Sequence, residues 1–503
     1  MPTDPAPEWD PGAPEVLADQ IGAYDAMRAR CPVARSDAQG WTLFRHADVV
    51  GAAQDHETFS SAVSRHLAVP SGIDPPEHTV YRRIVDRYFA PEVVTAFEPA
   101  CRAIAADLVG RLPRGVRVEA MTELAEPFAL RVQSAYLGWP TSLEEPLRAW
   151  TARNRAATLA RDPEATTAVA EEFDGYITAL LDERRALGPD APDDLTTRLL
   201  DERVDRRPLT DDELVSILRN WTVGELGTIA ASVGIVVHLL ATRPDVQATV
   251  RRYPATITEA TDELLRIEPP FISSRRVVAR PTELAGRRFE TGEKVTLLWA
   301  SADRDEDAFG DPDEFSLSRP AHDNLVYGTG IHVCPGAPLA RLELRVLVEE
   351  LLAATAGIDP WRGARPARTP YPAGGFTDVS VLLTAAPSPP PGSSRHPPPQ
   401  GAHMSEPLQI VDQPAAAPAH SCSCHEHDDA TPVLDVRVIP HAIRHAAVLG
   451  AFDAIAPGGS LVLVAPHAPL PMLAQLDQRA PVDVEFLVDG PTEWHVKVTR
   501  KVQ

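Results

Sequence analysis

A single cysteine inside a glycine-rich segment is the strongest chemical signal in this sequence. Cys334 lies in residues 325–345, L-V-Y-G-T-G-I-H-V-C-P-G-A-P-L-A-R-L-E-L-R, and follows Gly328 and Gly330. Glycines let a backbone bend sharply and come close to a flat ligand. From Ala337 onward apolar residues recur at three- and four-residue spacing, which predicts a helix. A cysteine at a helix start meets the positive end of the helix dipole, which favours the metal-binding thiolate. The segment therefore predicts a thiolate metal ligand, and a buried structural cysteine is the alternative.

Cationic side chains elsewhere in the chain could bind an anionic ligand. His78 and Arg82 are four residues apart, so they share one face of the helix predicted after two prolines. The segment F-I-S-S-R-R-V-V-A-R, residues 271–280, predicts a strand in which Arg275 and Arg276 point to opposite faces. Cations of this kind suit a ligand with two carboxylates. Taken alone, the same residues are explained equally well as solvated surface charges.

A long apolar helix is predicted between Thr210, which opens a T-D-D-E capping box, and Pro244. About 30 helical residues span about 45 Å, and a helix that is apolar nearly all round should be buried. Glu225 and Thr228 interrupt it on one face. We expect the Thr228 hydroxyl to bond back to the carbonyl of Gly224 and loosen the helix. Because a buried carboxylate without partners is costly, Glu225 needs an explanation. Proton delivery, a structural acid and a substrate contact all stay open.

Composition limits the class of protein. With 503 residues the chain should form two or more domains, and its 44% hydrophobic and 24% charged residues are typical of a soluble globular protein. The 5 scattered cysteines form no disulfide framework, which favours a reducing, cytoplasmic compartment. The acidic, proline-rich N-terminal segment contains no apolar run that predicts a signal or a membrane anchor. The net charge of −23 disfavours nucleic acid and anionic membranes as partners.

These motifs together resemble the cytochrome P450 family of soluble bacterial type, over residues ~10–385. The family's haem-binding loop has the form F-G-x-G-x-H-x-C-x-G, with Tyr327 here in place of the common phenylalanine. The resemblance implies haem b as cofactor and Cys334 as the axial ligand of its iron. It also implies that the haem is held by the loop residues Gly328, Gly330 and His332 and by His78, Arg82 and Arg276. Glu263 and Arg266 match the family's structural E-x-x-R motif, and the segment with Phe315 and Arg319 matches its meander.

The resemblance implies a mainly α fold with a smaller β region, and a haem-thiolate monooxygenase that inserts one oxygen atom from O2 into a small organic substrate. Thr228 stands at the threonine of the family's A-G-x-(D/E)-T motif. Gly227 occupies the place of the acid, so Glu225 becomes the candidate proton relay. This departure keeps open a peroxide-driven or non-oxygenating haem-thiolate enzyme. A haem sensor that signals through the C-terminal domain is the third reading.

Electrons should come from separate proteins, because the chain carries no flavin or ferredoxin signature. A ferredoxin-type donor with its reductase is therefore expected. Its predicted docking surface is a basic patch formed by arginines of two helices, with solvated charges as the alternative: Arg82, Arg83, Arg87, Arg341 and Arg345.

A proline-rich linker, residues 386–430, is predicted to separate residues 1–385 from a small α+β domain, residues 431–503. The linker contains a Cys/His cluster, residues 420–427. This cluster either binds a soft metal, copper or zinc, or is part of a disordered tail that binds no metal. The last domain should begin with a βαβ unit and end in a hairpin. It resembles the uncharacterised DUF2249 family. Whether its histidines, His441, His445 and His467, line a site or lie on the surface stays open.

Overall fold

The computed structural model describes residues 8–36, 39–64, 66–160, 162–385, 431–439, 441–465, 469–490 and 493–501. The chain forms two compact units, residues 1–387 and 388–503, and each is described here by itself. The predicted linker with its Cys/His cluster lies outside the described residues. The linker boundaries at 385 and 430 therefore stay predictions.

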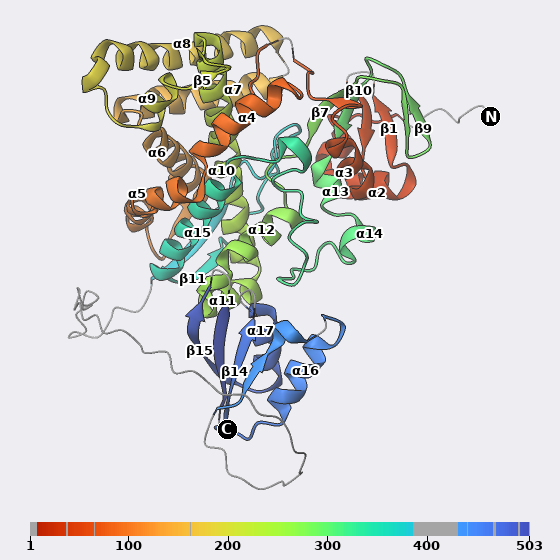
Figure 1. The fold of residues 1–503 in the computed structure, drawn as a ribbon, viewed down its shortest axis with the longest axis vertical. Coiled ribbons are helices and arrows are strands. Elements are labelled where there is room, and N and C mark those ends of the chain that lie inside the picture. The colour runs from red at the N-terminus through yellow and green to blue at the C-terminus, as the bar shows by residue number, and fades with distance from the viewer. Residues whose placement is uncertain are drawn as a thin grey trace, which may run out of the picture. The chain divides into compact units, whose positions relative to one another are not determined.

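Helix α10 (Asp211–Thr242) forms the centre of the first unit (Figure 1). It begins with the predicted capping box, in which Thr210 and Glu213 each bond the backbone of the other. Its neighbours are α6 (Glu126–Leu137), α8 (Pro163–Leu187), α12 (Ile257–Ile267) and α15 (Ala337–Ala353). By length and hydropathy α10 is able to cross a membrane, but most of its apolar stretch is buried inside this unit. The prediction of a long buried core helix is confirmed.

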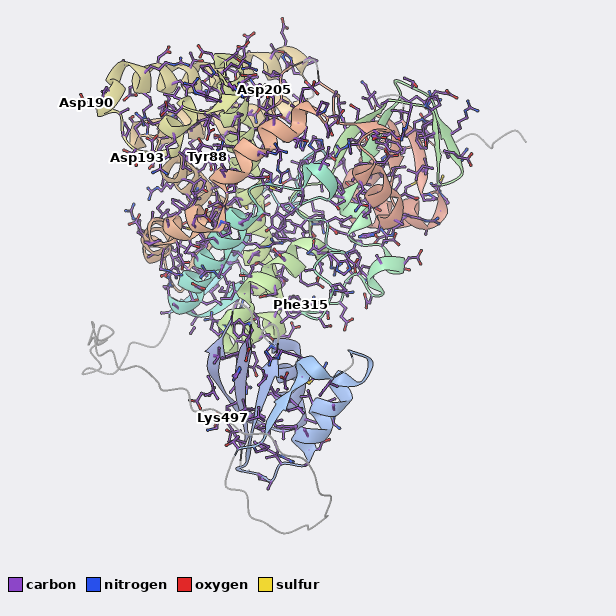
Figure 2. The ribbon with its side chains drawn as sticks, viewed as in Figure 1. Tyr88, Asp190, Asp193, Asp205, Phe315 and Lys497 are labelled. Carbon is purple, nitrogen blue, oxygen red and sulfur yellow. The ribbon has the colours of Figure 1, made fainter. Side chains whose placement is uncertain are left out.

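In the rest of the unit helices contribute more residues than strands do, as expected for a mainly α fold. At the end of α4, Tyr88, which Figure 2 labels, packs against Trp221 of α10 with ring centroids 5.1 Å apart. The other helices of the unit are α1 (Pro14–Ala18), α2 (Gln20–Arg30), α3 (His46–Gln54), α4 (Glu77–Tyr88), α5 (Pro91–Arg111), α7 (Glu144–Ala160), α9 (Leu195–Leu200), α11 (Pro244–Arg252), α13 (Trp299–Ala302) and α14 (Glu306–Phe309).

The largest sheet of this unit has the strand order β1-β2-β10-β7-β3. Strand β10 pairs parallel with β2, and the other pairs are antiparallel. In β7, Arg276 is buried and Arg275 is exposed, so the predicted alternation is confirmed. The strands are β1 (Val33–Ser36), β2 (Gly40–Leu43), β3 (Phe59–Ser60), β7 (Ser274–Val278) and β10 (Lys294–Leu297).

Smaller sheets complete the unit. The C-terminal strand β12 (Ser380–Ala385) lies between β11 (Thr355–Pro360) and β4 (Arg117–Glu119) in an antiparallel sheet. Two short hairpins join β5 (Arg203–Val204) to β6 (Arg207–Pro208) and β8 (Thr282–Leu284) to β9 (Arg287–Phe289).

The second unit is a four-stranded sheet with two helices. Its strand order is β13-β14-β16-β15; β13 and β14 are parallel and the rest antiparallel, which confirms the βαβ start and the closing hairpin. The first strand ends at Asp435, whose side chain accepts the Arg437 N–H at the start of a short helical turn. Of its histidines, His467 and the side chains of His441 and His445 lie outside the described residues. The elements are β13 (Val433–Asp435), α16 (His441–Asp453), β14 (Ser460–Ala465), α17 (Leu470–Arg479), β15 (Val482–Asp489) and β16 (Trp494–Arg500).

Candidate active site

The cysteine loop is tight and leads directly into α15, as predicted. The backbone N–H of Cys334 donates to the carbonyl of Tyr327 at 2.8 Å. Gly328 and Gly330 have φ angles of 71° and 75°, which side chains rarely adopt. A Cβ on Gly330 would also lie 2.6 Å from the carbonyl oxygen of Ala53. Both the turn and the close approach to α3 therefore need glycine at this position.

The sulfur of Cys334 is held in a setting suited to a metal-bound thiolate. Cys334 is exposed at the start of α15, three residues before Ala337. Surrounding protein raises the pKa of its thiol, whereas hydrogen bonds from the N–H groups of Gly336 and Ala337 lower it. These N–H groups favour the thiolate, and a bound cation would offset the remaining cost of its charge.

Two histidines and an arginine form a cluster of hydrogen-bonding side chains near this loop. The rings of His78 and His332 meet edge to face with centroids 4.6 Å apart. Their Nε2 atoms are buried and have no hydrogen-bond partner among the described residues. Arg276 is also buried. Burial, reinforced by the charge of Arg276, lowers the pKa of His332 to about 3. A ligand with carboxylates would satisfy these orphaned nitrogens, so the cluster fits the propionates of haem.

Arg82 acts on the loop itself. Its Nη1 donates to the carbonyl of Val333 at 2.7 Å and to that of Ile331 at 3.2 Å, and its Nε pairs with Asp86 at 2.6 Å. These contacts tie α4 to the residues just before Cys334. Arg82 therefore helps to shape the loop, and its contact with a propionate stays a prediction.

The E-x-x-R pair is a fully buried ion pair. Arg266 donates to Glu263 at 2.8 and 3.0 Å and to the carbonyl of Asp303 at 2.7 Å. Arg319 donates to the same Glu263 carboxylate at 2.9 Å, as the meander resemblance leads one to expect. Each charge has an opposite charge and a well-oriented partner. The pair fixes α12 to the segment that precedes the cysteine loop.

A second contact between α12 and the loop was not predicted from the sequence. The hydroxyl of Tyr327 donates to Asp262 at 3.2 Å, and Arg341 pairs with the same carboxylate at 2.8 Å. The Arg341 guanidinium also lies 4.5 Å from the centre of the Tyr327 ring. The replacement of phenylalanine by tyrosine was the only signal for this contact. Its hydroxyl joins the loop to α12, and its ring contacts Arg341 of α15.

The middle of α10 differs from expectation in one respect. The helix is continuous, and the Thr228 hydroxyl makes no hydrogen bond to any residue in the described part of the chain. Ser232 instead donates to the carbonyl of Thr228 at 2.8 Å. The predicted bond from Thr228 to Gly224 is therefore wrong, because the hydroxyl that turns back onto the helix comes one turn later.

Glu225 faces another carboxyl group, that of Glu343 on α15. The two side chains lie within hydrogen-bonding reach of each other. Burial raises the pKa of both, and the charge of Glu225 raises that of Glu343 further. Sequence reasoning missed Glu343, whose one signal was an acid at an apolar position of its helix. Glu225 and Thr228 share a helix face, but the acid is turned towards α15.

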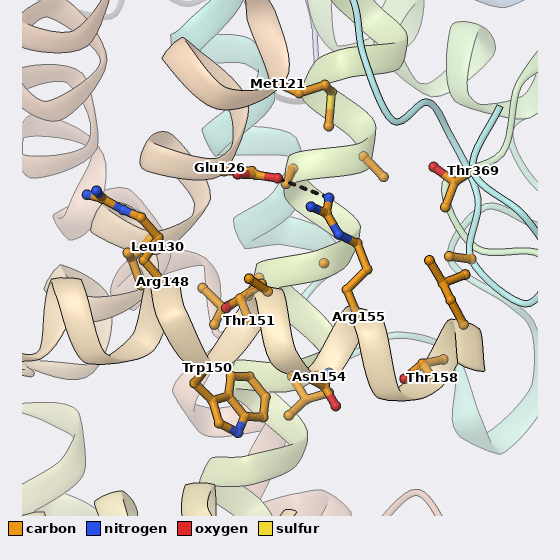
Figure 3. Close-up of a pocket in the computed structure, with 18 of the residues that line it drawn as sticks. Met121, Glu126, Leu130, Arg148, Trp150, Thr151, Asn154, Arg155, Thr158 and Thr369 are labelled. Carbon is orange, nitrogen blue, oxygen red and sulfur yellow. Dashed lines mark hydrogen bonds and ion pairs between the residues drawn. The ribbon is translucent and has the colours of Figure 1, made fainter. Parts of the chain in front are cut away.

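A cavity of about 430 Å³ lies between α7, α10 and the segment before β12 (Figure 3). Its size falls in the range of about 300–1,000 Å³ typical of small-molecule sites. Leu226 and Gly227 of α10 form part of its lining, and Gly227 adds no side chain there. Glu126 and Arg155 pair across it at 3.2 Å, so their charges offset each other. Most of the lining is apolar, as in Met121, Leu130, Ala230 and Phe376.

Four of the five arginines in the predicted basic patch are paired with carboxylates, and Arg82 has been described above. Arg87 pairs with Glu202 at 2.6 Å, and Arg345 pairs with Glu98 at 2.6 Å. Arg341 pairs with Asp262 as described above, and Arg83 is exposed. The local surface therefore carries less free positive charge than the sequence suggested.

Comparisons with known proteins agree with this geometry. A family model described as cytochrome P450 matches residues 255–354, and one described as an uncharacterized conserved protein (DUF2249) matches residues 433–500. Erythromycin C-12 hydroxylase of Saccharopolyspora erythraea is 33% identical over 67% of this chain and 88% of its own length. Cyclomarin C epoxidase of Salinispora arenicola is 32% identical over 65% of this chain and 86% of its own length.

Solved structures give the same result. Cytochrome P450 CYP109Q5 from Chondromyces apiculatus superposes with a TM-score of 0.68 and 29% identity, covering 75% of this chain and 99% of that one. A mutant of P450 EryK in complex with erythromycin B gives a TM-score of 0.68 and 30% identity, covering 76% and 99%. With its cysteine loop, its buried E-x-x-R pair and these relatives, the chain belongs to the cytochrome P450 family, a haem-dependent family of monooxygenases.

Proposed function

We propose that this chain uses haem b, O2 and electrons from separate redox proteins to oxidise a small, largely apolar organic molecule. The observation that carries the proposal is the loop that holds Cys334 at the start of α15, beside the buried Arg276 and two histidines whose Nε2 atoms have no hydrogen-bond partner among the described residues. Hydroxylase and epoxidase relatives support insertion of one oxygen atom as the reaction.

The cofactor would be held at both its iron and its carboxylates. Cys334 would ligate the iron, and His78, His332 and Arg276 would bind the propionates. Arg82 would hold the loop and reach a propionate. Haem with a thiolate ligand supplies the reduction of dioxygen and the cleavage of its O–O bond.

The cavity beside α7 and α10 supports the proposed class of substrate. Its walls are mainly apolar, and its Arg155 and Glu126 charges offset each other. A neutral molecule would enter without leaving a charge unpaired. Gly227 gives such a molecule room against α10.

Protons would reach the reacting oxygen along α10. The Thr228 hydroxyl is free of bonds to the described chain, so it can donate to and accept from a ligand. Glu225, one turn earlier, would supply a proton to the Thr228 hydroxyl. The i, i+3 spacing supports this order, because such residues share a helix face.

The electron donor is proposed as a ferredoxin-type protein with its reductase, in the cytoplasm. The ferredoxin-type donor would dock on the predicted surface around Arg83 of α4. The net charge of −23 makes nucleic acid and anionic membranes poor partners.

A peroxide-driven reaction is the second candidate. It is favoured by Gly227 at the place of the usual acid and by the turn of Glu225 towards Glu343. Such an enzyme needs no delivery of electrons and depends less on the usual acid.

The test compares the purified, haem-loaded wild type with Cys334→Ser. The wild type should give the reduced, CO-bound spectrum of thiolate ligation and oxidise apolar substrates with ferredoxin, reductase and NAD(P)H. Cys334→Ser should lose the thiolate spectrum and most of its turnover, because the thiolate ligand favours O–O cleavage. Cys31→Ser, a cysteine far from the loop in sequence, is the matched control and should behave as wild type. Turnover with hydrogen peroxide alone would favour the second candidate, and an unchanged spectrum in Cys334→Ser would refute thiolate ligation by this residue.

A further inference from the structure

A row of aromatic side chains leads away from the cysteine loop and is not used by the proposed function. It consists of Phe89, which follows α4, Trp221 of α10, and Tyr88 at the end of α4, which Figure 2 labels. The ring centroids of Phe89 and Trp221 are 5.4 Å apart, and those of Trp221 and Tyr88 are 5.1 Å apart. Such separations are those of rings in direct contact. All three side chains are buried.

Phe89 forms the inner end of this row. A Cβ built on Gly336 would lie 3.6 Å from Cε1 of Phe89 and 3.8 Å from Sγ of Cys334. The Phe89 ring therefore borders the predicted iron ligand, and the Trp221 ring is its neighbour. Because rings in contact exchange electrons readily, an electron of Trp221 has a short path to the ligand site.

The surroundings of Trp221 allow it to lose an electron but not to keep the radical that results. Its Nε1 is buried and has no hydrogen-bond partner among the described residues. After the loss of an electron the indole carries a positive charge, and no base is in place to take its proton. A buried charge without a partner is unfavourable, so Trp221 recovers an electron from a better-placed neighbour.

Tyr88 is that neighbour, because a carboxylate can receive its proton. Its hydroxyl donates to Oε1 of Glu202 at 3.2 Å. Glu202 also pairs with the exposed Arg87 at 2.6 Å, so the carboxylate lies near the surface. Burial and the charge of Glu202 raise the pKa of Tyr88, so the phenol keeps its proton until it is oxidised.

Tyr136 of α6 belongs to the same cluster but has a different hydrogen-bond acceptor. Its ring is stacked on Phe89 with centroids 6.0 Å apart. Its hydroxyl donates to the backbone carbonyl of Tyr88 at 2.5 Å. A carbonyl oxygen is a far weaker base than a carboxylate, so oxidation of Tyr136 would leave a charged phenol inside the protein. Of these two buried tyrosines, Tyr88 is therefore the one that can be oxidised to a neutral radical.

We propose that Trp221 and Tyr88 carry oxidising equivalents away from the haem site when no substrate is bound, and so protect the site from oxidative damage. This rests on the proposed function, which supplies the oxidant through O2 or peroxide. Trp221 gives one electron to the haem site. Tyr88 then gives one electron to Trp221, its O–H bond breaks, and the proton moves to the Glu202 carboxylate. A one-electron reductant of the ascorbate class in solution returns an electron to Tyr88, and the proton comes back from Glu202.

The test treats the haem-loaded full chain with peracetic acid in the absence of substrate and freezes it rapidly for electron paramagnetic resonance. Wild type should give a tyrosyl radical signal, and Tyr88→Phe should lose most of it. Glu202→Gln, which removes the proton acceptor, should weaken the signal as well. Tyr136→Phe is the matched control, because it removes the hydroxyl of the other buried tyrosine in the cluster, and it should keep the signal.

A second measurement follows the loss of the haem absorption band during the same treatment. The band should disappear faster in Tyr88→Phe and Trp221→Phe than in wild type or Tyr136→Phe, because oxidising equivalents that cannot leave attack the site. Trp221→Phe leaves a cavity, so melting curves check that this variant is folded. Tyr88→Phe keeps the ring and its packing, so it tests the same route without a cavity.

Loss of the radical signal in Tyr88→Phe, with retention in Tyr136→Phe, supports the route. An unchanged signal in Tyr88→Phe would place the radical on another tyrosine and overturn it. Equal haem lifetimes in all four proteins would overturn the protective role. The reduced, CO-bound spectrum of each sample reports separately on the proposed function. A thiolate spectrum in wild type without a radical at Tyr88 overturns this inference alone, whereas the absence of a thiolate spectrum overturns the proposed function and removes the source of the oxidant.

Discussion

Glu263 and Glu225 are both acids inside helices of the first unit, but their surroundings have opposite effects on a negative charge. Those of Glu263 stabilise it, whereas those of Glu225 disfavour it. Glu263 accepts from Arg266, from Arg319 and from the N–H of Ser316. Glu225 meets only another acid. The first carboxylate can stay ionised because its donors are built into α12 and the meander. Burial raises the pKa of the second group.

This difference separates two kinds of structure around the same loop. On the α12 side, paired charges and hydrogen bonds fix where Cys334 is held. On the α10 side, Glu225 and Glu343 are buried acids, and burial raises the pKa of both. A buried ion pair rigidifies, whereas a buried acid pair responds to pH. The following changes test the contrast, in order of expected effect.

Arg266→Ala should have the largest effect, because it leaves Glu263 buried with part of its compensation removed. We expect a loss of about 3–5 kcal/mol in the free energy of unfolding, measured by urea denaturation. Arg266→Lys should recover only part of it, since lysine cannot reproduce the bidentate fork. A loss below about 1 kcal/mol would mean that the ion pair matters no more than an exposed one.

Glu343→Gln should change how stability depends on pH. The folded pKa of Glu343 is raised above the unfolded value of about 4.3, so unfolding releases a proton in the window above about pH 4.3. Wild-type stability should therefore fall as pH rises, by up to about 1.4 kcal/mol per pH unit for this proton. The variant should show a flatter dependence. Asp303, whose pKa is raised to about 8, contributes equally to both proteins. Parallel curves for the two proteins would contradict a protonated Glu343.

Tyr327→Phe should have the smallest effect. It removes one hydrogen bond from Asp262, which keeps its ion pair with Arg341. A loss of about 0.5–1.5 kcal/mol is expected in urea denaturation, with the thiolate spectrum retained. Conversion to a spectrum without thiolate would show that the hydroxyl holds the loop more strongly than this contact implies.

Much of this organisation was readable in the sequence because it depends on local patterns. The glycines around Cys334 predicted a tight loop, and the capping box at Thr210 predicted the start of α10. Alternation along residues 274–278 predicted that Arg275 and Arg276 point to opposite faces, and one is exposed while the other is buried. The E-x-x-R spacing predicted Glu263 with Arg266, since residues three apart share a helix face.

What the sequence by itself determined was therefore the set of elements, the metal-ligand loop and the family to which it points. Tertiary structure alone decided which side chain Glu225 meets, because Glu343 is 118 residues away in the numbering and on a different helix. It also decided that Tyr327 bonds Asp262 and that Arg345 is bound by Glu98. The physical reason is that periodicity specifies which face of a helix is buried, whereas the partner across the interface depends on how two helices pack.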